Sequence, residues 1–106
     1  MLRQKEILQT ILDANPNHFS DWDLPNTEDL GTLSGITKDV EGNNILELDL
    51  EFKGIANIPS EIGDLTSLTH LGLGVNNITS IPIEIGNLID LIELDLIHNK
   101  LTSLFF

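Results

Sequence analysis

Apolar residues in the second half of this 106-residue chain recur at a period of 23. The first set is Ile45, Leu48, Leu50, Ile55, Ile58, Ile62 and Leu65. The second set is Leu68, Leu71, Leu73, Ile78, Ile81, Ile85 and Leu88, and a third begins with Leu91, Leu94, Leu96, Leu101 and Leu104. Such repetition predicts a repeat protein with copies at 45–67 and 68–90 and an incomplete copy at 91–106.

The apolar spacing changes within each copy. Residues 47–51, 70–74 and 93–97 alternate between polar and apolar, which is typical of a short strand with one buried face. The rest of each copy spaces its apolar residues more widely and contains Pro59 or Pro82, which favours a tight turn or a short 3₁₀ segment. Stacked copies at about 4.8 Å per strand would form a parallel sheet on one side and a line of returns on the other.

The first 44 residues do not share this period and are predicted to form a separate N-terminal cap. Ile7, Leu8 and Ile11 form a stripe that is typical of an amphipathic helix, here over about residues 2–14. A repeat array must cover its first coil, and a helix with one apolar face does so.

A loop with its own apolar residues follows this helix. These residues are Leu30, Leu33, Ile36 and Val40. The turn signal at residues 41–44 lies just before the first repeat strand, so residues 36–40 are predicted to pair antiparallel with residues 45–50 as a hairpin. The chain is thus divided into a cap over residues 1–44 and repeats over residues 45–106.

The repeats carry the residues of a known family. The second copy has Leu68, Leu71, Leu73, Asn76 and Ile78, and the third has Leu91, Leu94, Leu96, Asn99 and Leu101 at the same spacing. The sequence from 45 to 104 therefore resembles leucine-rich repeat proteins. This resemblance implies an α/β fold: a leucine-rich repeat solenoid, a short right-handed coil with a parallel sheet on its concave face and an N-terminal helical cap.

The resemblance also implies an asparagine ladder. In this ladder Asn76 and Asn99 turn inward and bond backbone groups of neighbouring coils, which satisfies buried polar backbone. Lys53 occupies the corresponding position in the first copy. The ladder is therefore expected to begin in the second coil, with Lys53 pointing to solvent.

The N-terminal segment resembles the caps of plant-type and related bacterial leucine-rich repeat proteins. The residues that carry this resemblance are the helix end at 13–16, Trp22, and Gly35, Ile36 and Thr37. Leu33 stands where those caps often have Trp, and the paired cysteines of plant caps are missing. The bacterial type is therefore the nearer resemblance, and many of its members are secreted or lie at the cell surface.

Charge narrows the classes of partner. The chain has 5 basic and 17 acidic residues, which give a formal net charge of −12. Nucleic-acid backbones and anionic membrane surfaces attract clustered Lys and Arg, which this sequence lacks. An apolar fraction of 41% is enough for a packed core. The sequence therefore predicts a folded acidic module that neither binds nucleic acid nor inserts into a membrane.

The absence of cysteine excludes disulfides and thiolate metal sites. The N-terminus lacks the continuous apolar run of a signal peptide, and no segment is long enough to span a bilayer. As written, the sequence is that of a cytoplasmic protein. The alternative is a mature secreted or cell-surface domain whose leader has been removed, so the compartment stays open.

The positions other than leucine at the predicted strands define one surface, called the concave face below. Its four lateral rows are Glu47, His70 and Glu93; Asp49, Gly72 and Asp95; Glu51, Gly74 and Ile97; and Phe52, Val75 and His98. The two glycines are expected to leave a shallow trough between acidic flanks. This mixture of acidic and apolar residues favours a protein or a basic, partly apolar peptide as partner. The alternative is that these are ordinary solvated strand positions.

Catalytic and metal sites are not predicted. Glu47, His70 and Glu93 offer zinc ligands, but strands of an open sheet do not converge and no orienting partner is evident, so neither metal nor cofactor is expected. The sequence has no Gly-rich phosphate loop and no nucleophile elbow. His18 is expected to pack in the cap loop, and Asp21 and Asp23 are expected to cap and solubilise. We therefore expect a protein that is not an enzyme.

The third copy stops at Leu104, Phe105 and Phe106, before the counterparts of Ile85 and Leu88. A terminal coil normally needs a polar outer face. Three outcomes follow: the two phenylalanines fold back as a lid, two chains dock end to end as a homodimer, or the native protein continues. The alternative to a binding module is therefore a structural cap, or a fragment of a longer array, with no binding role of its own.

Overall fold

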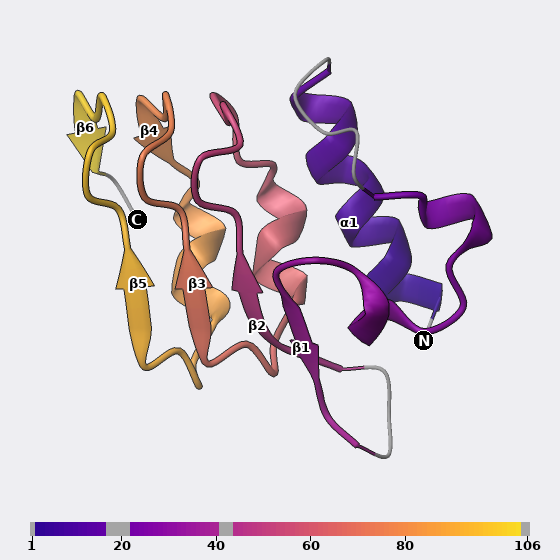
Figure 1. Cartoon of the computed structure of the whole chain (residues 1–106). Coiled ribbons are helices and arrows are strands. Elements are labelled where there is room, and N and C mark those ends of the chain that lie inside the picture. The colour runs from indigo at the N-terminus through magenta and orange to yellow at the C-terminus, as the bar shows by residue number, and fades with distance from the viewer. Residues whose placement is uncertain (1, 17–21, 41–43, 105–106) are drawn as a thin grey trace.

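The computed structural model describes residues 2–16, 22–40 and 44–104 (Figure 1). Helix α1 spans Leu2–Ala14, and short 3₁₀ helices follow at Leu24–Asn26 (η1), Leu30–Thr32 (η2), Ser60–Asp64 (η3) and Ile83–Asn87 (η4). The strands are β1 (Ile36–Lys38), β2 (Ile45–Asp49), β3 (His70–Gly72), β4 (Ser80–Ile81), β5 (Glu93–Asp95) and β6 (Ser103–Leu104).

The main sheet has the strand order β1-β2-β3-β5. β1 is antiparallel to β2, and the other neighbours are parallel. The register pairs Glu47 with His70 and His70 with Glu93, so parallel neighbours pair residues 23 positions apart. Figure 1 shows these strands side by side with η3 and η4 behind them. We call each parallel strand together with its return a coil: 45–67, 68–90 and 91–104.

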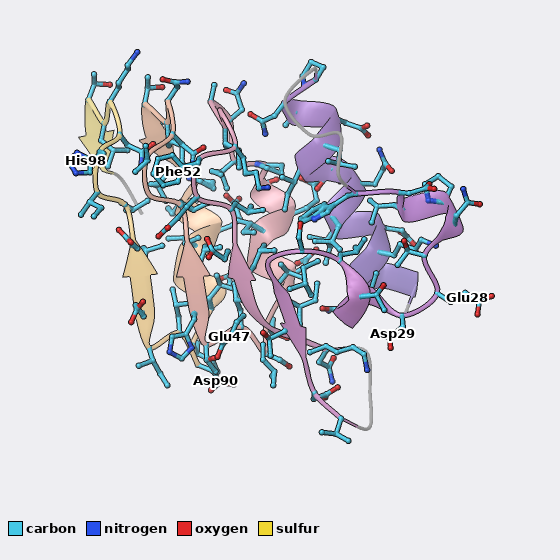
Figure 2. The ribbon with its side chains drawn as sticks, viewed as in Figure 1. Glu28, Asp29, Glu47, Phe52, Asp90 and His98 are labelled. Carbon is cyan, nitrogen blue, oxygen red and sulfur yellow. The ribbon has the colours of Figure 1, made fainter. Side chains whose placement is uncertain are left out.

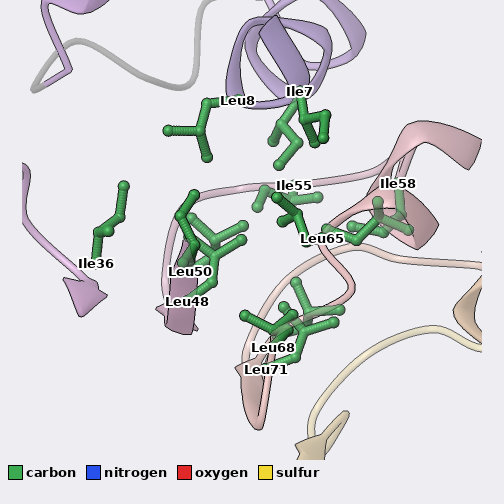
Figure 3. Close-up of a cluster of buried hydrophobic side chains, with 14 of the residues drawn as sticks. Ile7, Leu8, Ile36, Leu48, Leu50, Ile55, Ile58, Leu65, Leu68 and Leu71 are labelled. Atoms are coloured by element: carbon green, nitrogen blue, oxygen red, sulfur yellow. The ribbon is translucent and has the colours of Figure 1, made fainter. Parts of the chain in front are cut away.

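The core lies between the sheet and the returns and extends under helix α1. Ile7, Leu8 and Ile11 on the helix are fully buried, as are Leu50 and Ile55 of the first coil. Figure 3 shows Ile7 and Leu8 on the helix side of the same cluster as Leu50 and Ile55. Because burying such a side chain contributes about 1.5–3 kcal/mol, this stripe attaches the helix to the first coil.

Two buried polar side chains of the N-terminal segment bond the backbone of the first coil. Gln4 Oε1 accepts from Ile45 N at 3.1 Å. Asn15 Oδ1 accepts from Ala56 N at 2.8 Å and from Asn57 N at 3.0 Å, and Asn15 Nδ2 donates to Asn57 O at 2.7 Å. These side chains supply partners to backbone groups that would otherwise be buried without any.

The hairpin strand is shorter than predicted. β1 ends at Lys38, and its register shifts between Thr37 and Lys38. Asp39 begins the turn, since its side chain accepts from Asn44 N at 3.3 Å and from Asn44 Nδ2 at 3.0 Å. Val40 therefore lies outside the strand that was predicted over residues 36–40, and it is 96% exposed. The rest of the predicted turn, residues 41–43, lies outside the described residues.

The returns pack closely on one another. Pro59 and Pro82 stand at the N-caps of η3 and η4. A Cβ atom on Gly63 would lie 2.5 Å from Glu84 O, so η3 approaches η4 too closely for a side chain at this position. The corresponding Gly86 has nothing within 4 Å of such an atom. The two equivalent glycines therefore differ in their surroundings.

Candidate functional site

Strands β2, β3 and β5 and the residues that follow them contain the twelve residues predicted for the concave face. The strand register aligns two of their rows, Glu47, His70 and Glu93, and Asp49, Gly72 and Asp95. Backbone hydrogen bonds continue the pairing beyond the strands, since Phe52 N donates to Gly74 O at 3.4 Å and Val75 N donates to Ile97 O at 2.9 Å. In Figure 2, Phe52 and His98 lie near the upper ends of the strands and Glu47 lies near the lower end.

The concave face contains a hollow of about 360 Å³, called the acidic hollow below. It is lined by Gly35, Ile36, Thr37, Glu47, Leu48, Asp49, Glu51, His70, Gly72, Glu93 and Asp95. These include five carboxylates, and no Lys or Arg among the described residues lines it. Residues 35–37, from the hairpin segment, form one wall of the hollow. The repeat pattern of residues 45–104 does not predict this wall.

Two of the carboxylates are held by the backbone. Asp49 Oδ1 accepts from Glu51 N at 3.1 Å, and Asp95 Oδ1 accepts from Ile97 N at 3.0 Å. The middle coil has Gly72 at the same position, and a Cβ atom there would lie 3.2 Å from Asp49 Oδ1. The glycine therefore leaves room between two positioned carboxylates.

The carboxylates around Glu51 change its pKa. The nearby charge of Asp49 raises the pKa of Glu51 above its ordinary value of 4.5, and desolvation and the carboxyl of Asp95 raise it further. Gly74 is the second-coil counterpart of Glu51 and is buried. The expected trough is thus open at Gly72, while Gly74 is covered.

His70 makes two polar contacts. Its Nδ1 lies 2.8 Å from Thr69 Oγ1 and 3.7 Å from Glu47 Oε2. Thr69 Oγ1 also donates to Leu46 O at 3.0 Å, so the hydroxyl links the ring of His70 to the backbone of the first coil. Within the described part of the chain, no group of three or more His, Asp or Glu side chains is placed to hold a metal ion.

Three residues at the upper edge of the face have left-handed backbone. Phe52, Val75 and His98 have φ values of 57°, 54° and 57°. This conformation is uncommon outside glycine and is a strong outlier for a β-branched residue such as Val75. The strand alternation would turn Phe52 inward after the buried Leu50 and the outward Glu51, yet Phe52 is 75% exposed. No Gly or Asn at these positions signals the turn in the sequence.

Asn76 links the first and second coils from inside. Its Oδ1 accepts from Lys53 N at 3.1 Å and from Ile55 N at 2.9 Å. Its Nδ2 donates to the carbonyls of Leu50, Leu73 and Gly74. Lys53 is half-buried, and its backbone N–H is held by the asparagine. That its side chain points to solvent stays a prediction.

Asn99 repeats this arrangement one coil later. Its Oδ1 accepts from Ile78 N at 3.0 Å, and its Nδ2 donates to Leu73 O at 2.8 Å and Leu96 O at 3.1 Å. It is half-buried, whereas Asn76 is buried. The two asparagines therefore hold the same backbone turn in environments of different solvent access.

A second hollow of about 270 Å³ adjoins the acidic hollow. It is lined by Ser34, Gly35, Asp49, Glu51, Phe52 and Lys53. The two hollows share Gly35, which has a φ of +82° and lies against the backbone carbonyl of Asp49. A side chain there would collide with that carbonyl, so only glycine permits this close approach.

Other predicted residues lie elsewhere. Asp23 stands at the N-cap of η1, but its carboxylate accepts from Asn26 Nδ2 at 2.9 Å and caps no backbone N–H. Trp22 is buried and donates from Nε1 to Ser34 O at 3.0 Å. The predictions for His18, Asp21, Phe105 and Phe106 fall outside the described residues.

No protein-family model matches the chain, and no curated protein matches it. Solved structures do. The BIR3–SERK2 complex from Arabidopsis thaliana is similar with a TM-score of 0.76 and 28% identity, over 92% of this chain and 55% of that one. A plant ice-binding protein is similar with a TM-score of 0.82 and 27% identity, over 95% of this chain and 34% of that one.

The third structure is the LRR ectodomain of the plant membrane receptor kinase GASSHO1/SCHENGEN3 from Arabidopsis thaliana, with a TM-score of 0.73 and 27% identity. The match covers 98% of this chain and 13% of that one. The chain is a leucine-rich repeat protein. This leucine-rich repeat protein spans about half or less of the length of these three chains. They come from plants, and the bacterial type expected from the sequence stays a prediction.

Helices with the length and hydropathy needed to cross a bilayer do not occur among the described residues.

Proposed function

We propose that this leucine-rich repeat protein is a non-enzymatic module that binds a protein or a basic peptide on its acidic concave face. The observation that carries the proposal is the acidic hollow, in which five carboxylates gather without a lining Lys or Arg among the described residues. Like charges held together attract a cationic partner and speed its encounter. The twelve residues of the concave face are the proposed contact surface.

The neighbouring structures support a binding role. One is a complex of BIR3 with SERK2, and another is a receptor ectodomain in complex with CASPARIAN STRIP INTEGRITY FACTOR 2. Similar folds in those proteins therefore take part in complexes. By analogy, this chain is proposed to bind a partner as well.

The finer architecture is part of the proposal. Residues 45–104 form a right-handed solenoid, and residues 1–44 form its N-terminal cap, with α1 over the first coil. The bonds from Gln4 and Asn15 to the first-coil backbone support this division, because they replace the partners that a preceding coil would supply.

Peptide binding tests the proposal. The probes are labelled hexalysine and hexaglutamate, and the readout is fluorescence anisotropy at low and at physiological ionic strength. The test variant combines Glu47→Gln, Asp49→Asn, Glu93→Gln and Asp95→Asn. The Asn replacements keep the Oδ1 atoms that accept from Glu51 N and Ile97 N, so the fold is retained. We expect hexalysine to bind, hexaglutamate not to bind, and the variant to lose at least tenfold in affinity for hexalysine.

A matched control removes four acidic charges away from the hollow. It combines Glu28→Gln, Glu61→Gln, Glu84→Gln and Asp90→Asn, none of which lines the acidic hollow. Figure 2 shows Glu28 on the N-terminal segment, away from Glu47. This control should keep its hexalysine affinity within about twofold. Equal losses in both variants would mean that net charge alone attracts the peptide, and the proposed face would be wrong.

End-to-end association is the second candidate function. Leu91, Leu94, Leu96 and Leu101 of the third coil are only half-buried, whereas their second-coil counterparts Leu68, Leu71, Leu73 and Ile78 are almost fully buried. Apolar surface of this kind favours contact with a second chain or with another coil. Analytical ultracentrifugation at micromolar concentrations should detect a concentration-dependent mass. A constant monomer mass would exclude the homodimer.

A further inference from the structure

Large apolar side chains stand at the upper edge of the concave face, directly beside the acidic hollow. Phe52 is 75% exposed and Ile97 is 62% exposed, with the half-buried Val75 on the coil between them. We call Phe52, Val75 and Ile97 the apolar rim. Single exposed apolar residues are common on surfaces, but a group beside a charged hollow marks a contact surface.

The backbone holds Phe52 in its exposed position. Its φ of 57° departs from the strand, and its N–H donates to Gly74 O at 3.4 Å. A left-handed conformation costs a residue other than glycine about 1–2 kcal/mol. The chain therefore keeps an aromatic ring in solvent at a position that glycine would occupy with less strain.

The two hollows differ in the side chains that they favour. Both are bounded by Gly35, Asp49 and Glu51, so they adjoin along one wall. The first is lined by five carboxylates and, among the described residues, by no lysine, whereas the second adds Phe52 and the cation Lys53 to Asp49 and Glu51. A cationic side chain is therefore favoured more strongly in the first hollow, and an apolar side chain in the second hollow meets the phenylalanine ring.

We propose that the partner is a protein segment in which a basic residue is followed or preceded directly by a bulky apolar residue. The basic side chain enters the acidic hollow, and the apolar side chain packs on Phe52 in the second hollow. This inference rests on the proposed function, because it assigns the partner chemistry to the same face. Phe52 is then the residue that distinguishes such a segment from a merely basic one.

Two labelled peptides test this inference on the whole chain. One contains Gly-Arg-Leu-Gly and the other Gly-Arg-Ser-Gly, so they share the cation and differ in the apolar side chain. Wild-type protein should bind the leucine peptide about tenfold more tightly, as expected for burial of one such side chain. The variant Phe52→Gly should bind both peptides with the affinity of the wild type for the serine peptide. Glycine adopts a positive φ freely, so this variant should fold.

A matched variant removes an exposed apolar residue away from the face. Ile89 is 86% exposed and lines neither hollow, so Ile89→Ala should keep the tenfold preference. A preference that persists in Phe52→Gly, or that is lost equally in Ile89→Ala, would overturn the inference.

The four-residue neutral variant of the concave face separates the two proposals. One outcome is that wild type binds the serine peptide, the neutral variant does not bind it, and wild type shows no preference for the leucine peptide. The rim inference then fails and the proposed function stands. If neither peptide binds wild type more tightly than the neutral variant, the proposed function fails as well.

Discussion

The carboxylates of Asp49 in the first coil and Asp95 in the third both act on Glu51 and raise its pKa above 4.5. Gly74 is the second-coil counterpart of Glu51, and a Cβ atom there would lie 3.4 Å from Asp95 Oδ1, so no side chain fills this place. When all three carboxyls are ionised they repel one another, and a proton or a nearby cation relieves the repulsion. The stability of the protein should therefore depend on pH, and in the proposed function the same charges attract the cationic partner.

Glu51→Gln should change how stability depends on pH. The folded-state pKa of Glu51 is raised above 4.5, so its favourable contribution is complete below about pH 4.5 and is lost as the pH rises through the folded value. At pH 7 the ionised Glu51 of the wild type is repelled by the neighbouring carboxylates, whereas the glutamine is neutral. The variant should thus have the higher Tm at pH 7 and the same Tm below about pH 4.5. Thermal unfolding followed by circular dichroism measures this, and a gap that widens on acidification would contradict it.

Asn76→Ala should destabilise the protein more than Asn99→Ala. The first change removes the acceptor of Lys53 N and Ile55 N at a buried site and leaves carbonyls without a donor. A buried unsatisfied group costs about 1–3 kcal/mol, so we expect a loss of about 3 kcal/mol in the free energy of unfolding. Water can replace part of the hydrogen bonding of the half-buried Asn99, so Asn99→Ala should lower the free energy of unfolding by about half as much. Urea unfolding provides the comparison, and equal losses would show that solvent access does not matter here.

Gly63→Ala and Gly86→Ala should differ despite their equivalent positions. The new methyl group at residue 63 meets Glu84 O at 2.5 Å, while the one at residue 86 meets nothing within 4 Å. Overpacking costs about 1–3 kcal/mol, whereas alanine in open space is neutral or gains a few tenths because it restricts the unfolded chain. Chemical unfolding of both variants measures the difference. A destabilised Gly86→Ala would indicate a contact on the outer side of the second return.

Val75→Gly should stabilise the protein. Val75 has a φ of 54°, where a β-branched residue is strained and glycine is not. After the greater chain entropy of glycine in the unfolded state is subtracted, a gain of about 0.5–1 kcal/mol remains. Val40 is 96% exposed and its φ is not positive, so the control Val40→Gly should lose stability by a similar amount. A loss of stability in both variants would mean that the left-handed turn at Val75 carries no strain.

Much of the fold was predictable because repeat proteins encode it locally. The alternation around Leu48, Leu71 and Leu94 predicted strands, and β2, β3 and β5 occupy those segments. The resemblance to leucine-rich repeat proteins is confirmed by the solved structures. Val40 was placed wrongly because an apolar residue beside a turn looks like the end of a strand, and the polar contact between Asp39 and Asn44 decided the boundary instead.

The sequence predicted the candidate site only as rows of residues that neighbouring strands place side by side. The register followed from the period, but the wall at Gly35 comes from outside the repeats. Asn15 carried no repeat signal, yet its side chain bonds the backbone of Ala56 and Asn57. Such contacts join segments about forty positions apart, so no local pattern indicates them.

The sequence by itself determined the period, the inward leucines, the ladder asparagines and the acidic charge, because each is a property of residues close together along the chain. The tertiary structure decided which carboxyls meet, how Gly35 closes on Asp49, and where the rim of Phe52 stands. Those relations depend on how successive coils are placed side by side. A side chain missing in one coil, as at Gly72 and Gly74, leaves room beside the carboxylates of the flanking coils.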